Sequence, residues 1–289
     1  MSSKADLKKF SDAVATIKSI TRVYEQAAAR RMRMVKVEIE KISDYVSAAS
    51  ESYSDVKYSL VENFDENIKK VILNSSFRKP TRSTVLVLIS SQTQYFGQLI
   101  PRLSRLFISE YKKTRADCII LGKVGRELME KEEVYPESLT VFDFDDMNPD
   151  WTVVHKVSES IANYAKIVVF YGEYKSVFTQ EVKSSQLSEM VVIKNVPEAK
   201  KFRFRPSASQ SLGFLENQMI ASGFMQKLYE SQIAKYAARI KILEIGQVAE
   251  KISSAFDDLS RGKRRYRKLN YNKKQQQLYV GAGLWQEYS

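Results

Sequence analysis

The first 77 residues contain no proline and no glycine, and this constrains the fold more than any other feature of the chain. Their apolar residues recur in steps of three and four, the repeat of a helix that packs along another helix. The predicted seam, with polar breaks at its fifth and eighth positions, is Leu7, Phe10, Val14, Ile17, Thr21, Tyr24, Ala28, Arg31, Val35, Ile39, Ile42 and Val46. A helix of this length would extend far beyond the width of a small domain. It therefore needs a second long helix beside it or stands out as a stalk.

The expected partner of this helix lies at the other end of the same chain. From Leu212 the pattern is helical again, and its seam is Ile242, Ile245, Ala249, Ile252, Phe256 and Leu259. Two long seams separated by a different kind of sequence predict an antiparallel coiled coil within one chain. A four-helix bundle is the alternative, and the uninterrupted length of the first helix argues against it.

Between the helical ends, short apolar runs alternate with amphipathic segments, which is typical of an α/β layer domain. The sequence predicts strands at 84–90, 117–122, 139–144 and 166–172, late strands at 190–194 and 201–205, and helices at 99–113, 123–131 and 151–164. Residues 177–186 are ambiguous. The predicted domains are an N-terminal coiled-coil helix at 1–77, an α/β domain at 82–205, and a C-terminal coiled-coil helix at 207–289 that pairs with the first.

The α/β region lacks the sequence signatures of an enzyme. The loop at 90–97 has one glycine and matches neither a dinucleotide-binding nor a phosphate-binding motif. Asp143, Asp145 and Asp146 are conceivable metal ligands, but acidic loop residues after a strand are more often solvated. His155 has no candidate nucleophile. We expect no catalytic residue, no cofactor and no metal.

The net charge of +12 predicts acidic partners, which are nucleic acid, anionic lipid or an acidic protein surface. Two basic groups are candidate partner contacts, and we expect the charge to concentrate on the two helical ends that carry them. The first is Arg30, Arg31, Arg33 and Lys36, and the second is Lys263, Arg264, Arg265 and Arg267. A solvated charged face is the commoner meaning of such runs.

The cysteine and histidine content also limits the possibilities. Cys118 is the only cysteine and His155 the only histidine, which excludes an internal disulfide and argues against a zinc site. Cys118 suits a neutral position in a core. No apolar run reaches the roughly 18 residues of a membrane-spanning helix.

Several motifs in one order resemble the gamma subunit of F-type ATP synthases. Residues 20–33, ITRVYEQAAARRMR, are similar to that family's ITKAMEMVAASKMR, and Ser90, Ser91 and Gly97 match the ends of its SSDRGLCG loop. Further similar segments are GKVGR at 122–126, VFYGEYKSVFTQ at 169–180, FRPS at 204–207, LYES at 228–231 and AARI at 237–240. The chain departs from the family at Tyr24, in the loop at 92–96, at 248–250 and in the tail at 281–289.

The resemblance implies a non-catalytic rotor shaft in which long N- and C-terminal helices form an antiparallel coiled coil beside a Rossmann-like α/β domain. Such a shaft couples rotation, driven by proton or sodium flow, to cycling of the catalytic subunits for ATP synthesis or hydrolysis. The implied partners are the alpha and beta subunits of the catalytic hexamer, an epsilon/delta-type stalk subunit and the membrane rotor c-ring. The implied location is peripheral, on the cytoplasmic face of a bacterial plasma membrane or the matrix side of the mitochondrial inner membrane.

Two other functions are compatible with parts of the sequence. A basic coiled-coil protein that binds nucleic acid, or a scaffold, would use the second basic group and the nearby Tyr266, Tyr271 and Tyr279. The basic residues do not form one long stripe, and no nucleic-acid motif is present. A Rossmann-like enzyme with helical arms would need a cofactor loop that the sequence lacks.

Overall fold

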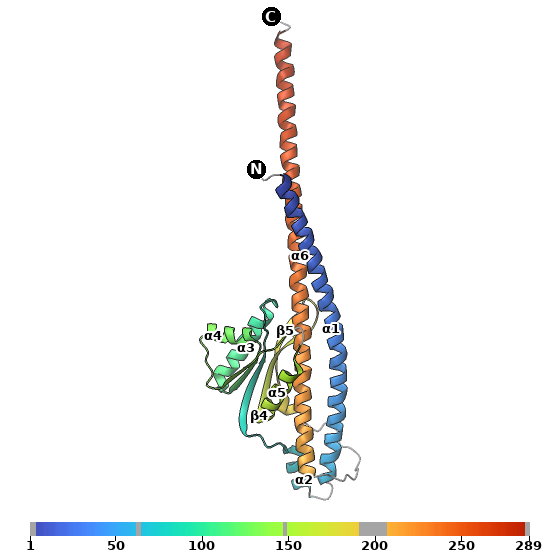
Figure 1. Ribbon diagram of the computed structural model, residues 1–289, viewed down its shortest axis with the longest axis vertical. Helices are drawn as coiled ribbons and strands as arrows, with labels where there is room; N and C mark the ends of the chain where they lie inside the picture. Colours follow the sequence, from blue (N-terminus) through green and yellow to red (C-terminus); the bar gives the residue numbers. More distant parts are fainter. Residues whose placement is uncertain (1–3, 62–64, 147–148, 191–206, 287–289) are drawn as a thin grey trace. The chain divides into compact units, whose positions relative to one another are not determined.

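The computed structural model describes residues 4–61, 65–146, 149–190 and 207–286. The chain divides into two compact units, residues 1–242 and residues 243–289. The first unit contains an α/β domain and two long helices, and the second contains the rest of the C-terminal helix. In the first unit the two helices lie side by side, and the sheet packs against one of them (Figure 1).

The two long helices are α1 (Lys4–Val61) and α6 (Ala208–Gln286). Near one end of their contact, Ala28 and Val35 of α1 pack against Ala237 and Ile233 of α6. Near the other end, Ala49 and Tyr53 of α1 pack against Leu212 and Met219 of α6. Rising numbers in α1 meet falling numbers in α6, so the helices are antiparallel. This confirms the predicted fold class of a long helical pair with an α/β domain.

The buried seam of α1 differs from the predicted one at Tyr24 and Arg31, both of which are exposed. Its described apolar members, in steps of three, four and once seven residues, are Ala28, Met32, Val35, Ile39, Ile42, Ala49 and Tyr53. The prediction placed Arg31 on the seam, but Arg31 is exposed and Met32 is buried. Steps of three and four both fit a helical repeat, and the charge of Arg31 keeps it in water. The second predicted seam, from Ile245 onward, lies outside the described side chains.

The first helical region is two helices, whereas the sequence predicted one. The helix α1 ends at Val61, and the short α2 (Glu66–Asn74) begins after Asp65. Asp65 has extended backbone angles, φ −62° and ψ 153°, at the N-cap position of α2. Aspartate is favoured at that position, so Asp65 is the sequence signal for the break.

The sheet has five strands in the order β3-β2-β1-β4-β5. Its strands are β1 (Arg82–Ile89), β2 (Asp117–Leu121), β3 (Leu139–Phe142), β4 (Tyr164–Tyr174) and β5 (Gln180–Gln186). Neighbours among the first four pair in parallel, and β5 pairs antiparallel with β4, which assigns the ambiguous segment. A 3₁₀ turn, η1 (Leu187–Met190), follows β5. The predicted strand at 201–205, and that at 190–194 apart from Met190, lie outside the described residues.

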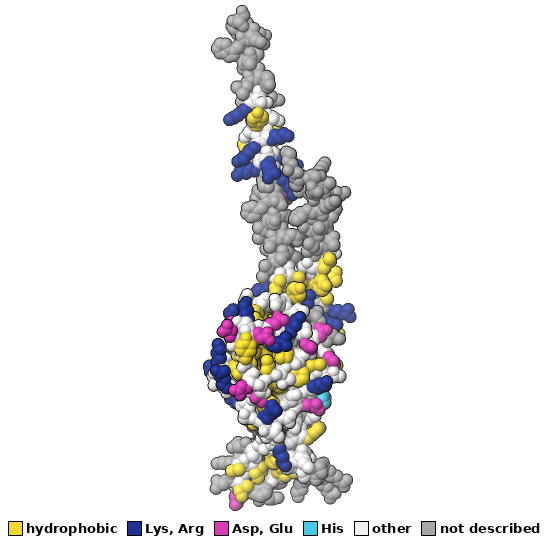
Figure 2. All heavy atoms as spheres, turned by 60° about the vertical axis from the view of Figure 1, so that its left-hand side comes forward, with side chains coloured by type: hydrophobic (Ala, Val, Ile, Leu, Met, Phe, Trp, Pro, Cys, Tyr) yellow, Lys and Arg dark blue, Asp and Glu magenta, His cyan; other side chains and the backbone are white. Residues whose placement is uncertain are grey.

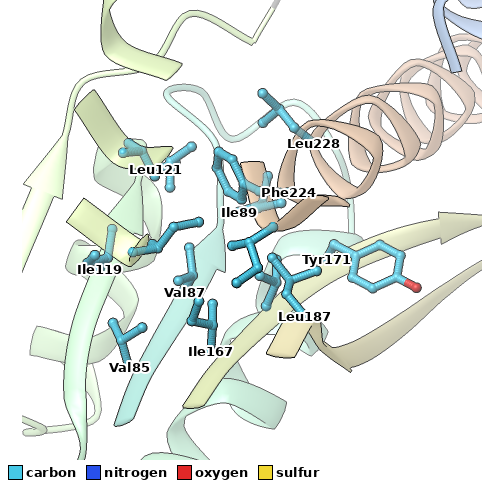
Figure 3. Close-up of a cluster of buried hydrophobic side chains, with 14 of the residues drawn as sticks. Val85, Val87, Ile89, Ile119, Leu121, Ile167, Tyr171, Leu187, Phe224 and Leu228 are labelled. Carbon is cyan, nitrogen blue, oxygen red and sulfur yellow. The ribbon is translucent and has the colours of Figure 1, made fainter. Parts of the chain in front are cut away.

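Helices cover both faces of this sheet. Alternate residues of β1, such as Leu86 and Leu88, face α3 (Leu99–Thr114) and α4 (Lys123–Lys131). The residues between them, such as Val87, face α5 (Trp151–Ala162) and α6. Phe224 and Leu228 of α6 reach into this second face (Figure 3). The long C-terminal helix is therefore a layer of the α/β domain as well as half of the helical pair.

The single cysteine lies in the first of these faces. Cys118 is 1% exposed and packs among the residues under α3 and α4. Burial raises the pKa of its thiol to about 12, and the Asp117 carboxylate adds to the shift. The thiol is therefore neutral at physiological pH, in a core position as the sequence predicted.

Candidate functional site

The first predicted basic group lies on the outer side of α1. Arg30, Arg31, Arg33 and Lys36 are all exposed, and they flank the buried Met32 and Val35 of the seam. The Lys36 ammonium lies 5.0 Å from the centroid of the Tyr174 ring at the end of β4. Within the described part of the chain, the three arginines make no ion pair. Their guanidinium groups are available to a partner.

The second predicted basic group lies on the part of α6 that forms the second unit. Every residue from 261 to 275 is exposed, including Lys263, Arg264, Arg265 and Arg267. Lys and Arg side chains project from several sides of this helix (Figure 2). The sequence has no Asp or Glu from 259 to 286. Residues 261–275 of this helix therefore present positive charge to solvent, with no carboxylate among them to offset it.

The net charge is unevenly divided along the chain. Residues 207–289 carry +6, whereas residues 1–77 and the α/β region at 82–205 carry +2 each. The two helical ends together thus carry +8 of the total +12, as predicted, and most of it lies on α6. The strongest electrostatic attraction for an acidic partner is therefore expected at the C-terminal helix.

In sheets of this strand order, ligands usually bind beyond the carboxyl ends of the strands where the order reverses, here between β1 and β4. The helix α6 occupies this position. A Cβ atom added to Gly172 of β4 would lie 3.2 Å from the Cβ of Ala234. Ala234 and Ala238 also pack against Phe96 and Leu99, which follow β1. The helix α6 therefore packs against this edge of the sheet, at the ends of β1 and β4.

A buried ion pair fixes α6 at this edge of the sheet. The Lys235 ammonium lies 2.9 Å from Oδ1 of Asp146 and also donates to the Ser90 carbonyl at the end of β1. The other oxygen of Asp146 accepts from the backbone N–H groups of Gln92, at 2.8 Å, and Thr93, at 3.3 Å. Lys235 is 1% exposed and Asp146 is 4% exposed. This polar cluster joins α6 to the loop that follows β1 and to the loop that follows β3.

The burial of Asp146 corrects the prediction that the acidic residues after β3 are solvated. Asp143 and Asp145 are exposed as predicted, but Asp146 has the buried lysine as its partner. No three His, Cys, Asp or Glu residues are grouped to hold a metal ion in the part of the chain that the structure describes. His155 is exposed, and its Nδ1 lies 3.5 Å from the Glu159 carboxylate.

A second buried cluster joins α6 to α1 and to the segment that enters the sheet. The fully buried Glu216 of α6 accepts hydrogen bonds from the Tyr53 hydroxyl and the Ser76 hydroxyl, both at 2.6 Å. It also accepts from the backbone N–H groups of Phe77 and Arg78. Three segments far apart in sequence thus meet at one carboxylate.

The Lys57 ammonium of α1 completes this cluster by donating to the Tyr53 hydroxyl at 2.9 Å and to the Ser75 carbonyl at 2.7 Å. Burial lowers the pKa of Lys57, and the nearby Glu216 carboxylate partly offsets that shift. Burial and the hydrogen bond to Glu216 both raise the pKa of Tyr53. Tyr53 thus stays protonated and keeps donating to Glu216.

The family-like motifs in the α/β domain lie where chain segments approach closely. Gly122 has φ +88°, and an added Cβ would lie 2.5 Å from the Ser91 backbone. A Cβ added to Gly125 would lie 2.8 Å from the Cβ of Ser90, which is too close for two carbon atoms. The N–H of Val124 donates to the Ser91 carbonyl at 3.0 Å. These glycines and serines form one contact that closes the loop after β1 onto the start of α4.

The AARI motif and the departure at Tyr24 meet across the helical pair. Ala237 packs against α1 on one side of α6, and Ala238 packs against the α/β domain on another side. The Arg239 guanidinium lies 5.2 Å from the centroid of the Tyr24 ring. An aromatic ring at position 24 therefore has a cation to contact, a favourable interaction that an aliphatic side chain cannot make.

The comparison with known proteins covers nearly the whole chain. A family model described as ATP synthase matches residues 3–277. The chain belongs to this family. It is similar to the ATP synthase gamma chain of Cytophaga hutchinsonii, with 22% identity over 82% of this chain and 85% of that one. It is also similar to the gamma chain of Lawsonia intracellularis, with 25% identity over 65% of each.

A solved structure supports the fold. A chain from the central stalk and c-ring of the Tetrahymena thermophila mitochondrial ATP synthase matches with a TM-score of 0.54 and 17% identity. The match covers 79% of this chain and 99% of that chain. As a member of this family, the chain is a non-catalytic subunit of an ATP synthase complex. The matches give no support to the nucleic-acid-binding alternative.

Membership in such a complex places the chain at an energy-transducing membrane. Over the residues that are described, none of the helices has an apolar stretch long enough to cross a bilayer.

The Lys235–Asp146 pair should be essential to stability, because its loss would leave a charge without a partner in the interior. We expect Asp146→Ala to lower the free energy of unfolding by about 3–5 kcal/mol. Adding Lys235→Met should recover at least half of this loss. Urea unfolding of the full chain measures both.

The matched control for this prediction is Glu110→Ala, which breaks the exposed pair with Lys113. It should cost less than about 1 kcal/mol. An Asp146→Ala variant as stable as this control would show that the buried pair does not hold α6 to the sheet.

Proposed function

We propose that the chain is the rotor shaft of an F-type ATP synthase and turns inside a hexamer of alpha and beta subunits. The observation that carries the proposal is that α6 packs against two parts of the chain. It lies along α1 and also forms a layer of the α/β domain. Lys235 and Glu216 add buried polar contacts at two places along this helix. Such a connected body can transmit torque between its parts.

The proposed mechanism uses shape and charge rather than bond chemistry. The shaft is asymmetric, because α6 and α1 carry different exposed residues, so it presents a different surface to each catalytic subunit. Each orientation then changes the free energy of closing each nucleotide site by a different amount. Rotation driven by proton or sodium flow would thereby drive ATP synthesis, and ATP hydrolysis would drive the reverse rotation.

The two basic groups are proposed to contact acidic segments of the hexamer. The group on α1 is Arg30, Arg31, Arg33 and Lys36, and that on α6 is Lys263, Arg264, Arg265 and Arg267. Exposed ion pairs contribute only about 0–1 kcal/mol each. Contacts of this strength favour association and correct register, yet they can be exchanged as the shaft turns.

The remaining proposed partners are an epsilon/delta-type stalk subunit and the membrane rotor c-ring. The short helix α2 offers the exposed Ile68 and Val71 at the end of the helical pair near Val61. The chain would then be peripheral, on the cytoplasmic face of a bacterial plasma membrane or the matrix side of the mitochondrial inner membrane.

The direct test of this function is recovery of the tagged chain from its native membrane in mild detergent, followed by an ATPase assay. We expect two nucleotide-binding subunits of similar size in a three-to-three-to-one ratio with the chain, together with ATPase activity. Recovery of the chain alone, or with nucleic acid and no ATPase activity, would refute the proposal.

The basic group of α6 provides a second test. Replacing Lys263, Arg264, Arg265 and Arg267 together by Gln should weaken binding to the catalytic hexamer by roughly tenfold, because several exposed ion pairs are lost. The affinity can be measured by titrating the isolated hexamer with the full chain. The difference from the wild-type chain should shrink at high salt.

The control for this variant removes four exposed charges from the α/β domain, at Lys112, Lys113, Arg126 and Lys131. It should bind the hexamer as the wild-type chain does. Equal affinity of the α6 variant and this control would contradict the assigned role of the basic group.

A further inference from the structure

A cavity of about 210 Å³ lies at the edge of the sheet where its parallel strands begin, on the face that α3 covers. Ser83 and Thr84 of β1 and Lys166 of β4 line it from the sheet. Thr114 and Arg115, where α3 ends, line it from the helix. The cavity is therefore at the opposite edge of the sheet from the buried ion pair that fixes α6.

This cavity lies where neighbouring strands start at different places. The strand β1 pairs with β4 from Arg82 onward, but it pairs with β2 only from Val85 onward. The start of β1 thus has no β2 residue beside it. The hydroxyl groups of Ser83 and Thr84 lie at this open strand end, and neither makes a hydrogen bond with a described residue. Both hydroxyls are available to donate to a ligand.

The unpaired charge at the cavity is positive. Lys166 and Arg115 are exposed, and neither forms an ion pair within the residues that the structure describes. The two carboxylates of the wall, those of Asp117 and Glu110, each lie 3.2 Å from a neighbouring arginine or lysine nitrogen. An anion bound in the cavity would reduce the repulsion between the two unpaired cations.

Arg115 has an unusual backbone conformation at this cavity. Its φ of 50° and ψ of 32° lie in the left-handed region, and its N–H donates to the Tyr111 carbonyl at 2.8 Å. Glycine is the usual residue at such a helix end, because it adopts these angles without a steric cost. The Arg115 guanidinium lies 5.5 Å from the centroid of the Tyr111 ring. The chain thus keeps an oriented cation here at a cost in backbone strain.

The size and the donors of the cavity select the ligand. Sites for small organic ligands usually have volumes of about 300–1,000 Å³. At about 210 Å³ this cavity suits a compact anion, or the head of a larger molecule whose remainder stays in solvent. Donors from three elements surround it, and the tetrahedral oxygens of phosphate can accept from several directions, whereas a carboxylate is planar. Arginine and lysine are both common phosphate ligands.

We infer that this cavity binds a phosphate group, with Arg115 and Lys166 as its charged donors and Ser83 and Thr84 as its hydroxyl donors. The bound group links the end of α3 to β1 and β4. This edge of the sheet is at the same end of the first unit as α2 (Figure 1). Inorganic phosphate in solution and the headgroup of an anionic lipid are therefore the two sources of the group. The site is independent of the proposed rotor function, because it uses no residue of α1 or α6.

Protection of the Lys166 amine in the full chain tests the site. The rate at which an acetylating reagent modifies Lys166 is measured by mass spectrometry, with inorganic phosphate added at constant ionic strength. We expect phosphate to slow this modification until the effect saturates. The Arg115→Gln variant should need a roughly tenfold higher phosphate concentration for half-protection, because one charge-assisted hydrogen bond is lost.

Two matched controls accompany this test. Lys156 is exposed on α5, which covers the other face of the sheet, and phosphate should not change its modification rate. Arg102→Gln removes an exposed arginine from the first turn of α3 and should leave the protection of Lys166 unchanged. A Lys166 amine that phosphate does not protect, or one protected equally in the Arg115→Gln variant, would overturn the site.

Vesicles distinguish the two sources of the phosphate group. The same assay is run with vesicles of phosphatidylcholine alone and with vesicles that also contain phosphatidylglycerol. Protection of Lys166 by the anionic vesicles that Arg115→Gln removes assigns the site to a lipid headgroup. Protection by inorganic phosphate without protection by vesicles assigns it to free phosphate. Protection by neither overturns the site and leaves the rotor function intact.

Discussion

The structure depends on the packing of two long antiparallel helices, each of which is stabilised by burying apolar side chains against the other. The helix α1 has 58 residues, about 87 Å at the usual rise per residue. Its buried seam from Ala28 to Tyr53 meets α6, and α6 in turn covers one face of the sheet with Phe224 and Leu228. The sheet, the helix α1 and the segment at 76–78 thus all contact α6. A force on one of these parts is therefore transmitted to the others through α6.

This sharing explains why the domain has the architecture of a nucleotide-binding fold without its chemistry. The carboxyl ends of β1 and β4 form the usual ligand crevice of such a sheet, but here Ala234 and Lys235 of α6 pack against these strand ends. The buried lysine pairs with Asp146 where a ligand would otherwise meet the loops. The edge of the sheet that usually binds a ligand here connects the α/β domain to α6.

Much of the fold could be predicted from the sequence because the apolar residues recur with the periods of helices and strands. The absence of Pro and Gly predicted α1, and the apolar runs predicted β1 to β4. The step from Ala28 to Met32 rather than Arg31 was missed, because three- and four-residue steps fit equally well. The break before α2 was also missed, although Asp65 is a helix-start residue. The polar joints at Lys235–Asp146 and Glu216 were missed because each joins residues distant in sequence, and pattern alone does not show which charges are buried.

We expect α1, the part of α6 up to Ile242 and the α/β domain to turn as one body. The test is a bead attached to a cysteine at the exposed Tyr135 in the α/β domain, with the complex held by its hexamer. The native Cys118 is buried with a raised pKa and would stay unlabelled. On addition of ATP we expect the bead to rotate continuously in one direction. A stationary bead on a complex that hydrolyses ATP would contradict the account.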